Sequence, residues 1–374
     1  MHEPSHPTPE PTQRPRVVAL DALRGWLMLL TVSGEILLDG MWHLSQSATL
    51  RELFKEMAHS PWHGITYYDM GLPGYVLVMG ASLGIAVHRR REGRTPGREL
   101  VGPVLRRAVI LFALGILCNG GLRDPWPDVR LAGALQRLAI CYAATYFLAW
   151  NLGWRALSAL FVATMLGYWA MLEWVPFPGG TPGAYEMHDN LAAFVDSRLL
   201  PGAKFFGTWD SEGILSSLPA IATCVAGVLI GRLFLLAMPE SRRFLLLATI
   251  AVVSLVLAKA WSWVMPFNKP MWTSSFAMAI IGAFTAHLIL FHFVAQWRGG
   301  TRLLYPLVVY GRNSLAAFVG DHLIDFREIA LRLVGGSVAL ALGAWAGLAV
   351  ALAVIGIQWA LLFWLDRRKV QISI

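Results

Sequence analysis

Long apolar runs, each about one membrane thickness in length, dominate the pattern of this chain. A helix needs about 20 residues to cross a hydrocarbon core of ~30 Å, whereas the strands of a membrane barrel are short and alternate in polarity. Lipid accepts only these two backbone arrangements, so the uninterrupted runs predict helices. We expect ten spans, at 17–38, 66–87, 102–120, 131–150, 156–176, 213–235, 244–264, 271–294, 304–324 and 337–365.

Composition supports an all-α, polytopic membrane helix bundle. The chain has 374 residues, of which 56% are hydrophobic and 14% are charged, against about 25% charged residues in soluble proteins. Tryptophans gather near the predicted span ends, as an aromatic belt requires. The three cysteines fall in or beside apolar spans without a CxxC pair. We interpret them as small apolar side chains and expect no metal.

The distribution of lysine and arginine predicts the orientation. Cytoplasmic loops are enriched in both residues. The more basic set of loops contains Arg14, Arg16, Arg89, Arg90, Arg91, Arg94, Arg98, Arg155, Arg242, Arg243, Arg298, Arg302, Arg367, Arg368 and Lys369. Placing this set inside gives a chain with both termini in the cytoplasm. It also explains the net charge of +8 without a nucleic-acid partner.

The chain is predicted to form one domain, 17–374, after a disordered cytoplasmic tail, 1–16, that lacks a signal peptide. Two predicted outer loops, 39–65 and 177–212, are long enough to act as lids or binding loops. The first contains a short amphipathic stretch from Leu50 to Met57. No internal repeat is visible, which argues mildly against a secondary transporter.

Three ionisable residues occupy the first predicted span, where charge is costly and usually functional. Asp21 and Arg24 are three positions apart and share a helix face. Thr31 and Glu35 return to that face, which gives a polar stripe toward the outer side. One alternative is that Asp21 and Arg24 only anchor the helix end. Glu35 has no basic neighbour in its own turn, so we expect it to lie deep and to act in catalysis.

A histidine motif lies at the outer entrance of the second span. It reads His59–Ser60–Pro61–Trp62–His63–Gly64–Ile65–Thr66 and is followed by Asp69. A histidine suits a general base, and Asp69 is expected to fix its tautomer through one ring nitrogen. The structural alternative is that the histidine only lies at the membrane interface. Of the two histidines in the motif, His63 is the weaker candidate for the general base.

Further polar residues lie inside or near other spans. Arg106 and Arg107 extend the basic cytoplasmic loop and suit a phosphate-bearing donor. Gln136 and Arg137 in the fourth span, and Arg312 and Asn313 in the ninth, suit an anionic group or a developing oxyanion. Snorkelling toward the interface is the structural alternative for Arg137.

Six short motifs recur in the order and at the spans typical of a known family. They are Leu20–Asp21–Ala22–Leu23–Arg24–Gly25, the His59–Thr66 stretch with Asp69, Gly133–Ala134–Leu135–Gln136–Arg137, Trp209–Asp210–Ser211–Glu212–Gly213–Ile214–Leu215, Asn268–Lys269–Pro270–Met271–Trp272–Thr273 and Gly311–Arg312–Asn313–Ser314. With these motifs the chain resembles the heparan-α-glucosaminide N-acetyltransferase family over nearly all of its length after the N-terminal tail.

The resemblance implies transfer of an acetyl group from cytoplasmic acetyl-CoA to the amine of a glucosamine on the far side of the bilayer. It implies that His59 is the active-site histidine, and it suggests a homodimer and a bacterial inner membrane. The family often has an asparagine where this chain reads Val32–Ser33–Gly34–Glu35. Glu35 then either replaces the asparagine or indicates a different acceptor.

These observations predict two sets of contacts. Acetyl-CoA is expected to contact Asp21, Arg24, Arg106, Arg107, Gln136, Arg137, Arg312 and Asn313. The acceptor, an amino sugar or glycan, is expected to contact Trp62, His63, Trp209, Asp210 and Trp272. Three alternatives stay open: O-acylation of an envelope glycan, transport of a small polar solute, and a structural membrane protein.

Overall fold

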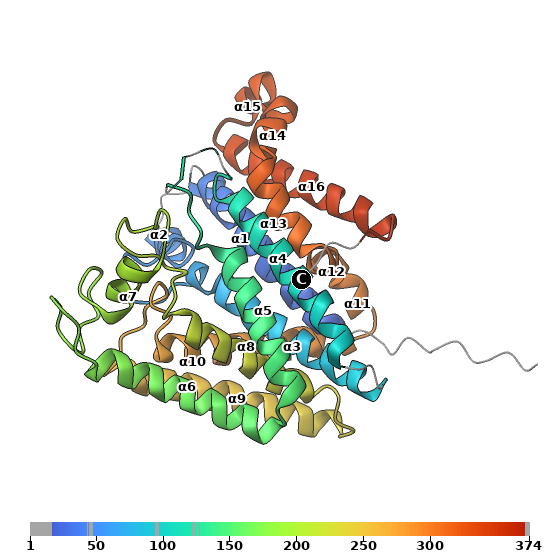
Figure 1. Ribbon diagram of the computed structural model, residues 1–374. Coiled ribbons are helices and arrows are strands. Elements are labelled where there is room, and N and C mark those ends of the chain that lie inside the picture. The colour runs from blue at the N-terminus through green and yellow to red at the C-terminus, as the bar shows by residue number, and fades with distance from the viewer. Residues whose placement is uncertain are drawn as a thin grey trace, which may run out of the picture.

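The computed structural model describes residues 17–42, 44, 48–93, 97–121, 123, 125–126 and 128–370. The predicted tail and Arg94 lie outside the described residues, as do the side chains of Leu50 and Arg98. Within the described part the regular structure is helical (Figure 1), and an isolated antiparallel bridge joins Arg130 to Gly202.

Each predicted span overlaps a helix or a pair of helices. The elements are α1 Val18–Trp42, α2 Ala48–Glu56, η1 Tyr68–Met70, α3 Gly71–Glu92, α4 Gly97–Cys118, α5 Ala134–Asn151, α6 Trp154–Trp174, α7 Leu191–Leu199, α8 Ser217–Arg232, α9 Glu240–Trp261, α10 Ser274–Gln296, α11 Gly300–Leu303, α12 Tyr305–Arg312, α13 Ser314–Leu323, α14 Phe326–Val334, α15 Gly336–Leu342, η2 Gly343–Trp345 and α16 Ala346–Arg367. The amphipathic stretch predicted in the first outer loop coincides with α2.

Six helical segments of the described chain are long and apolar enough to cross a membrane. The most apolar window of the segment formed by η1 and α3 is 72% buried, whereas those of α4, α6 and α9 are only 22% buried. The second group presents apolar side chains outward, among them Val109 on α4 and Leu245 and Val256 on α9. Apolar helices with an apolar exterior require lipid around them. The chain is therefore a multi-pass membrane protein.

Two predicted spans were drawn as single helices, and the structure corrects both. The span 304–324 is divided at Asn313, which separates α12 from α13 with φ −119° and ψ 31°. The span 337–365 is divided at Gly343, which has φ +55°. Glycine adopts that left-handed conformation without a Cβ clash. Only α16 from the second span is a long continuous helix.

Small residues let α3 and α8 pack at close range in the centre of the bundle. A Cβ atom at Gly80 on α3 would lie 2.0 Å from the carbonyl oxygen of Cys224 on α8. A Cβ atom at Gly227 would lie 2.0 Å from that of Leu77. In lipid the hydrophobic effect does not bring helices together, so membrane helices associate through close van der Waals packing at small residues such as these. This pair fixes α3, and two of the predicted catalytic residues, His59 and Asp69, lie in the loop and in η1 just before that helix.

We expect Gly227→Ala to destabilise the protein by about 1–3 kcal/mol, the usual cost of forcing extra volume into a packed core. Gly356→Ala in α16 is the matched control, because no described atom outside the surrounding backbone of α16 itself lies within 4 Å of the position its Cβ would take. That change should be neutral or stabilising by up to about 1 kcal/mol. Thermal unfolding in detergent measures both, and equal midpoints would contradict the close packing of α3 on α8.

Candidate functional site

His59 and Asp69 face each other at the entrance of α3. The His59 Nδ1 atom lies 2.7 Å from Asp69 Oδ1. The His59 side chain is 57% exposed, whereas that of Asp69 is 2% exposed. A buried charged carboxylate requires donors, and Oδ2 accepts hydrogen bonds from the backbone N–H of Ser60 at 3.0 Å and the Thr66 hydroxyl at 3.0 Å. The structure thus brings together the histidine and the carboxylate predicted to orient it.

Lys269 is the third member of this group, and sequence reasoning missed it. Its Nζ atom lies 3.1 Å from His59 Nδ1 and 3.5 Å from Asp69 Oδ1. Burial lowers the pKa of the Lys269 ammonium, and the negative charge of Asp69 opposes that effect only in part. Lys269 was noticed only as a member of a matching motif, because no local spacing connects it to a histidine 210 positions away.

The proton on the imidazole can be assigned from these distances. Nδ1 can serve only one of its two neighbours, and the contact with the Asp69 carboxylate is the shorter. A carboxylate accepts and does not donate, so Nδ1 donates to Asp69. The Nε2 lone pair of His59 is then free to take a proton. Lys269 stays beside the pair as a cation that partly balances Asp69.

Two backbone contacts fix Lys269 in this position. The Gly64 N–H donates to the Phe267 carbonyl at 2.9 Å, and the Asn268 side chain donates to the Trp62 carbonyl at 3.1 Å. The Asn268 side chain also accepts from the Met271 N–H at 2.8 Å, which closes the turn around Lys269. The loop before α3 and the loop before α10 are therefore joined as one unit.

An ion-pair cluster forms another wall of the site. Arg130 donates from Nε and Nη2 to the two oxygens of Asp210, at 2.8 and 2.7 Å, and from Nη2 to Glu212 at 2.9 Å. Burial acts to raise the pKa of Asp210, but the hydrogen bonds and charge of Arg130 outweigh it, so this pKa is lowered. The bidentate geometry attaches the loop before α8 to the start of α5.

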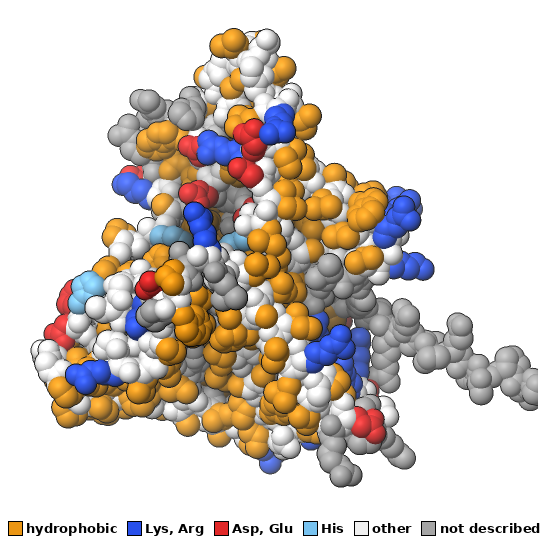
Figure 2. Space-filling view, turned by 45° about the horizontal axis from the view of Figure 1, so that its top comes forward, with side chains coloured by type: hydrophobic (Ala, Val, Ile, Leu, Met, Phe, Trp, Pro, Cys, Tyr) orange, Lys and Arg blue, Asp and Glu red, His pale blue; other side chains and the backbone are white. Residues whose placement is uncertain are grey.

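These walls enclose a pocket of about 470 Å³, within the range of small-molecule sites. Figure 2 shows acidic, basic and histidine side chains gathered around a hollow in the upper half of one face, with hydrophobic side chains over much of the rest. The polar residues that line the pocket are His59, Ser60, Asp69, Asn119, Arg130, Ser211, Glu212, Lys269 and His322, and Trp62 and Phe206 are among its apolar lining.

Several residues predicted to contact the acceptor lie behind this pocket. Trp209, Asp210 and Trp272 are at most 2% exposed. Trp272 supports Arg137, whose guanidinium lies 5.0 Å from the centre of the indole ring. Trp62 is the exception, because it lines the pocket and donates to the Tyr185 carbonyl at 2.8 Å. His63 lies farther out, with Nε2 4.0 Å from Glu186.

The residues predicted to contact the donor are spread through the bundle. Arg137 is buried and donates to Ser216 Oγ at 2.6 Å, and it does not snorkel. Gln136 is also buried, and no hydrogen bond within the described chain engages its side-chain atoms. Neither side chain lines the His59 pocket.

The remaining donor candidates contact neighbouring helices. Arg24 is buried, donates to Ser82 Oγ at 2.5 Å and lies 3.7 Å from Asp21, so it joins α1 to α3. Arg107 stacks over Tyr142, and Arg106 is exposed. Arg312 pairs with Asp366 at 3.5 Å, and Asn313 is buried at the break between α12 and α13.

Glu35 occupies a different place from the one expected. It is exposed and lines a second cavity near the C-terminal end of α1, outside the His59 pocket. The reason is that α1 runs on to Trp42, so Glu35 lies two turns before its end.

The fold and this site together define a multi-pass membrane protein in which a buried carboxylate orients a half-exposed histidine, an arrangement suited to proton transfer. No family model matches the chain. It is 25% identical over 329 residues to the heparan-α-glucosaminide N-acetyltransferase of Mus musculus, covering 71% of this chain and 49% of that protein. It is 25% identical over 373 residues to the Homo sapiens protein of the same name, covering 83% of this chain and 53% of that protein.

This similarity supports a distant relationship between the chain and these two N-acetyltransferases. The chain spans about half the length of the curated relatives it matches. The resemblance noted from six short motifs is thus accompanied by low overall identity over most of the chain.

We expect Arg130→Met to destabilise the protein by about 3 kcal/mol, because it leaves the buried Asp210 carboxylate without its counter-charge. Arg123→Met, at an exposed position, is the control and should change stability by less than about 0.5 kcal/mol. The folded-state pKa of Asp210 is lowered, so the stabilisation is complete above the unfolded value of about 3.9 and is lost as the pH falls through the folded value. Thermal midpoints between about pH 2 and 7 should therefore separate wild type and variant by a constant amount above about pH 5 and by less as the pH falls below about 3.9. A difference that stays the same down to about pH 2 would contradict this account.

Proposed function

We propose that the chain is a membrane acyltransferase that moves an acetyl group from acetyl-CoA to the amine of a glucosamine-type sugar. The observation that carries the proposal is the His59–Asp69 pair at a pocket of about 470 Å³. The names of the two relatives supply the reaction class. We further propose ten spans with both termini in the cytoplasm, which gives the His59 pocket an outer position.

In the proposed reaction, His59 Nε2 takes a proton from the acceptor amine as the nitrogen attacks the thioester carbonyl. A C–N bond forms, the C–S bond breaks, and the proton passes from His59 to the departing thiolate. A general base of this kind contributes about 10²–10⁴ in rate. The alternative route acetylates His59 first and then transfers the group to the amine. A label trapped on His59 with labelled acetyl-CoA would favour that route.

Arg130 and Lys269 are our proposed partners for the carbonyl oxygen as it gains negative charge. Both line the same pocket as His59, whereas Gln136, Arg137 and Asn313 do not. A donor aimed at a developing oxyanion typically contributes about 3–4 kcal/mol. This assignment replaces the three residues suggested by sequence alone.

A narrow internal space suggests how the donor approaches from the opposite side. Its volume is about 20 Å³, and Thr31, Tyr75 and Ser314 are among the polar residues that line it. Leu135 and Phe318 line both this space and the His59 pocket. We propose that the pantetheine arm passes here between α1, α3, α5 and α13, which requires these side chains to move apart.

His59→Ala should lower acetyl transfer to glucosamine at least about 100-fold, since it removes the general base. His188→Ala, an exposed histidine of the loop before α7, is the control and should keep wild-type activity. The measurement is labelled product from labelled acetyl-CoA with protein in detergent. If His59→Ala is as active as wild type, the base is elsewhere. A product labelled on oxygen would indicate an O-acyltransferase.

Lys269→Met should lower the rate of acetyl transfer about 100-fold, because it removes a charge that we propose faces the carbonyl oxygen as that oxygen becomes negative. Lys269→Arg keeps the charge and should retain more of the wild-type rate than Lys269→Met does. The initial rate of transfer from labelled acetyl-CoA measures both variants. Equal losses in the two variants would mean that Lys269 only supports the loop.

A further inference from the structure

A second and larger cavity adjoins the His59 pocket. Its volume is about 940 Å³, and it is lined by the end of α1, α2, the end of α13 and α14. His322 lines both spaces, and Ala58, the neighbour of His59 in the chain, lines the larger one. A molecule that reaches His59 from the outer side can therefore occupy both at once.

Carboxylates outnumber cations around this outer cavity. Asp39, Asp325, Glu35 and Asp321 all line it. Arg327 pairs with Asp39 at 3.1 Å, and Asp325 accepts the Glu328 N–H at 2.8 Å as the cap of α14. These two carboxylates are thus already used by the fold.

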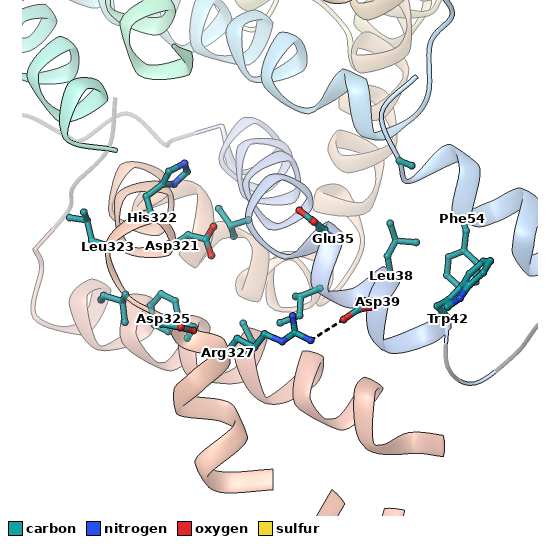
Figure 3. Close-up of a pocket in the computed structure, with 16 residues that line it drawn as sticks. Glu35, Leu38, Asp39, Trp42, Phe54, Asp321, His322, Leu323, Asp325 and Arg327 are labelled. Carbon is teal, nitrogen blue, oxygen red and sulfur yellow. Dashed lines mark hydrogen bonds and ion pairs between the residues drawn. The ribbon is translucent and has the colours of Figure 1, made fainter. Parts of the chain in front are cut away.

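Glu35 and Asp321 remain, and Figure 3 shows them turned toward the space between α1 and α13. No hydrogen bond or ion pair within the described part of the chain engages the Glu35 carboxylate. Among the described residues, Asp321 accepts a hydrogen bond only from a neutral donor, the Gln358 amide at 2.9 Å. Two such carboxylates that face one space favour a positively charged occupant.

Asp321 is held in place from inside the bundle. Gln358 is 4% exposed, and its amide oxygen accepts a hydrogen bond from the buried Ser33 hydroxyl at 2.9 Å. This leaves the Gln358 NH₂ group to donate to Asp321. A buried network that orients a carboxylate toward a cavity is a feature expected of a binding site.

The other walls of the cavity are aromatic. Trp42 and Phe54 pack edge to face with ring centres 5.1 Å apart, and Phe326 lies on α14. Aromatic faces bind cations and the apolar faces of ring-shaped ligands. No group of three histidine, cysteine, aspartate or glutamate side chains among the described residues is arranged to hold a metal ion. The walls thus suit an organic cation built of rings.

We propose that the outer cavity binds a second, protonated amino-sugar unit of the acceptor, next to the unit that is acetylated at His59. The acceptor class is then a glycan with several unsubstituted amines and without sulfate or uronate groups, which Glu35 and Asp321 repel. This inference rests on the proposed function, and the acceptor that it describes differs from the heparan-α-glucosaminide in the names of the two relatives.

The test is equilibrium binding of a fully de-N-acetylated glucosamine trimer to the full-length protein in detergent at about pH 6.5, where its amines carry protons. Acetyl-CoA is left out, so binding does not depend on transfer. The neutral N-acetylated trimer is the comparison. We expect the cationic trimer to bind at least tenfold more tightly, and this preference to weaken at high salt.

The variant Glu35→Gln/Asp321→Asn should reduce the preference to less than threefold, whereas Glu99→Gln, an exposed carboxylate on α4, should keep it. Thermal midpoints check that each variant is folded. Equal binding of the two trimers to wild type, or a preference that survives in the double variant, would overturn the proposal. Equally tight binding of a linear triamine would overturn the amino-sugar assignment, because charge alone would then suffice.

A separate assay of wild type with glucosamine and labelled acetyl-CoA distinguishes the two proposals. Preferential binding of the cationic trimer without any transfer would support the outer cavity and reject the acetyltransferase. Transfer to glucosamine without that binding preference would support the acetyltransferase and reject the proposed site in the outer cavity.

Discussion

The site depends on keeping one buried carboxylate charged. Asp69 is 2% exposed, and a charge in so dry a place is tolerated only when donors and a counter-charge surround it. The carboxylate and its partners come from three segments: the loop before α3, η1, which contains Asp69 itself, and the loop before α10. Each donor that stabilises Asp69 also fixes the shape of the pocket. The orientation of His59 is thus a consequence of satisfying Asp69.

The rest of the bundle holds these three segments in register. Close packing of Gly80 and Gly227 fixes α3 against α8. The Asn268–Trp62 and Gly64–Phe267 hydrogen bonds then join the loop before α3 to the loop before α10. The Arg130–Asp210 pair fixes the opposite wall. A rigid constellation on helix ends is what general-base chemistry requires, because small errors in geometry cost large factors in rate.

How much of the fold and of the site can be predicted from the sequence depends on how far apart the interacting residues lie along the chain. The apolar runs gave the helices because hydropathy is a local property, and His59 and Asp69 were paired because ten residues separate them. Lys269 and Arg130 were not recognised as site residues, because their partners are brought close only by folding. The helix breaks at Asn313 and Gly343 were missed for a related reason. Hydropathy continues through both positions, while local backbone geometry interrupts the helix.

Glu35 illustrates a second limit of prediction from the sequence. Periodicity predicts that it shares a face of α1 with Asp21 and Arg24, whereas the structure shows Glu35 as an exposed wall of the outer cavity, because α1 continues beyond it. Which side chains share its space depends on α13 and α14, almost 300 residues later in the chain. A face of a helix can be read from sequence, whereas the cavity that the face lines cannot.

The His59 pocket and the adjoining outer cavity differ in the balance of positive and negative side chains. This difference explains how the proposed reaction can both bind a protonated amine and use a neutral one. An acceptor amine must lose its proton before it can attack a thioester, but a protonated amine is the form that acidic walls attract. Beside His59 the charges of Asp69 and Lys269 largely offset each other, and Nε2 is free to accept a proton. No ion pair within the described part of the chain engages Glu35 or Asp321, and Arg327, which lines the same cavity, pairs with Asp39. Protonated amines would therefore be retained in the outer cavity, while a neutral amine beside His59 gives its N–H proton to Nε2 as it attacks. Binding and deprotonation are separated in space, and neither weakens the other.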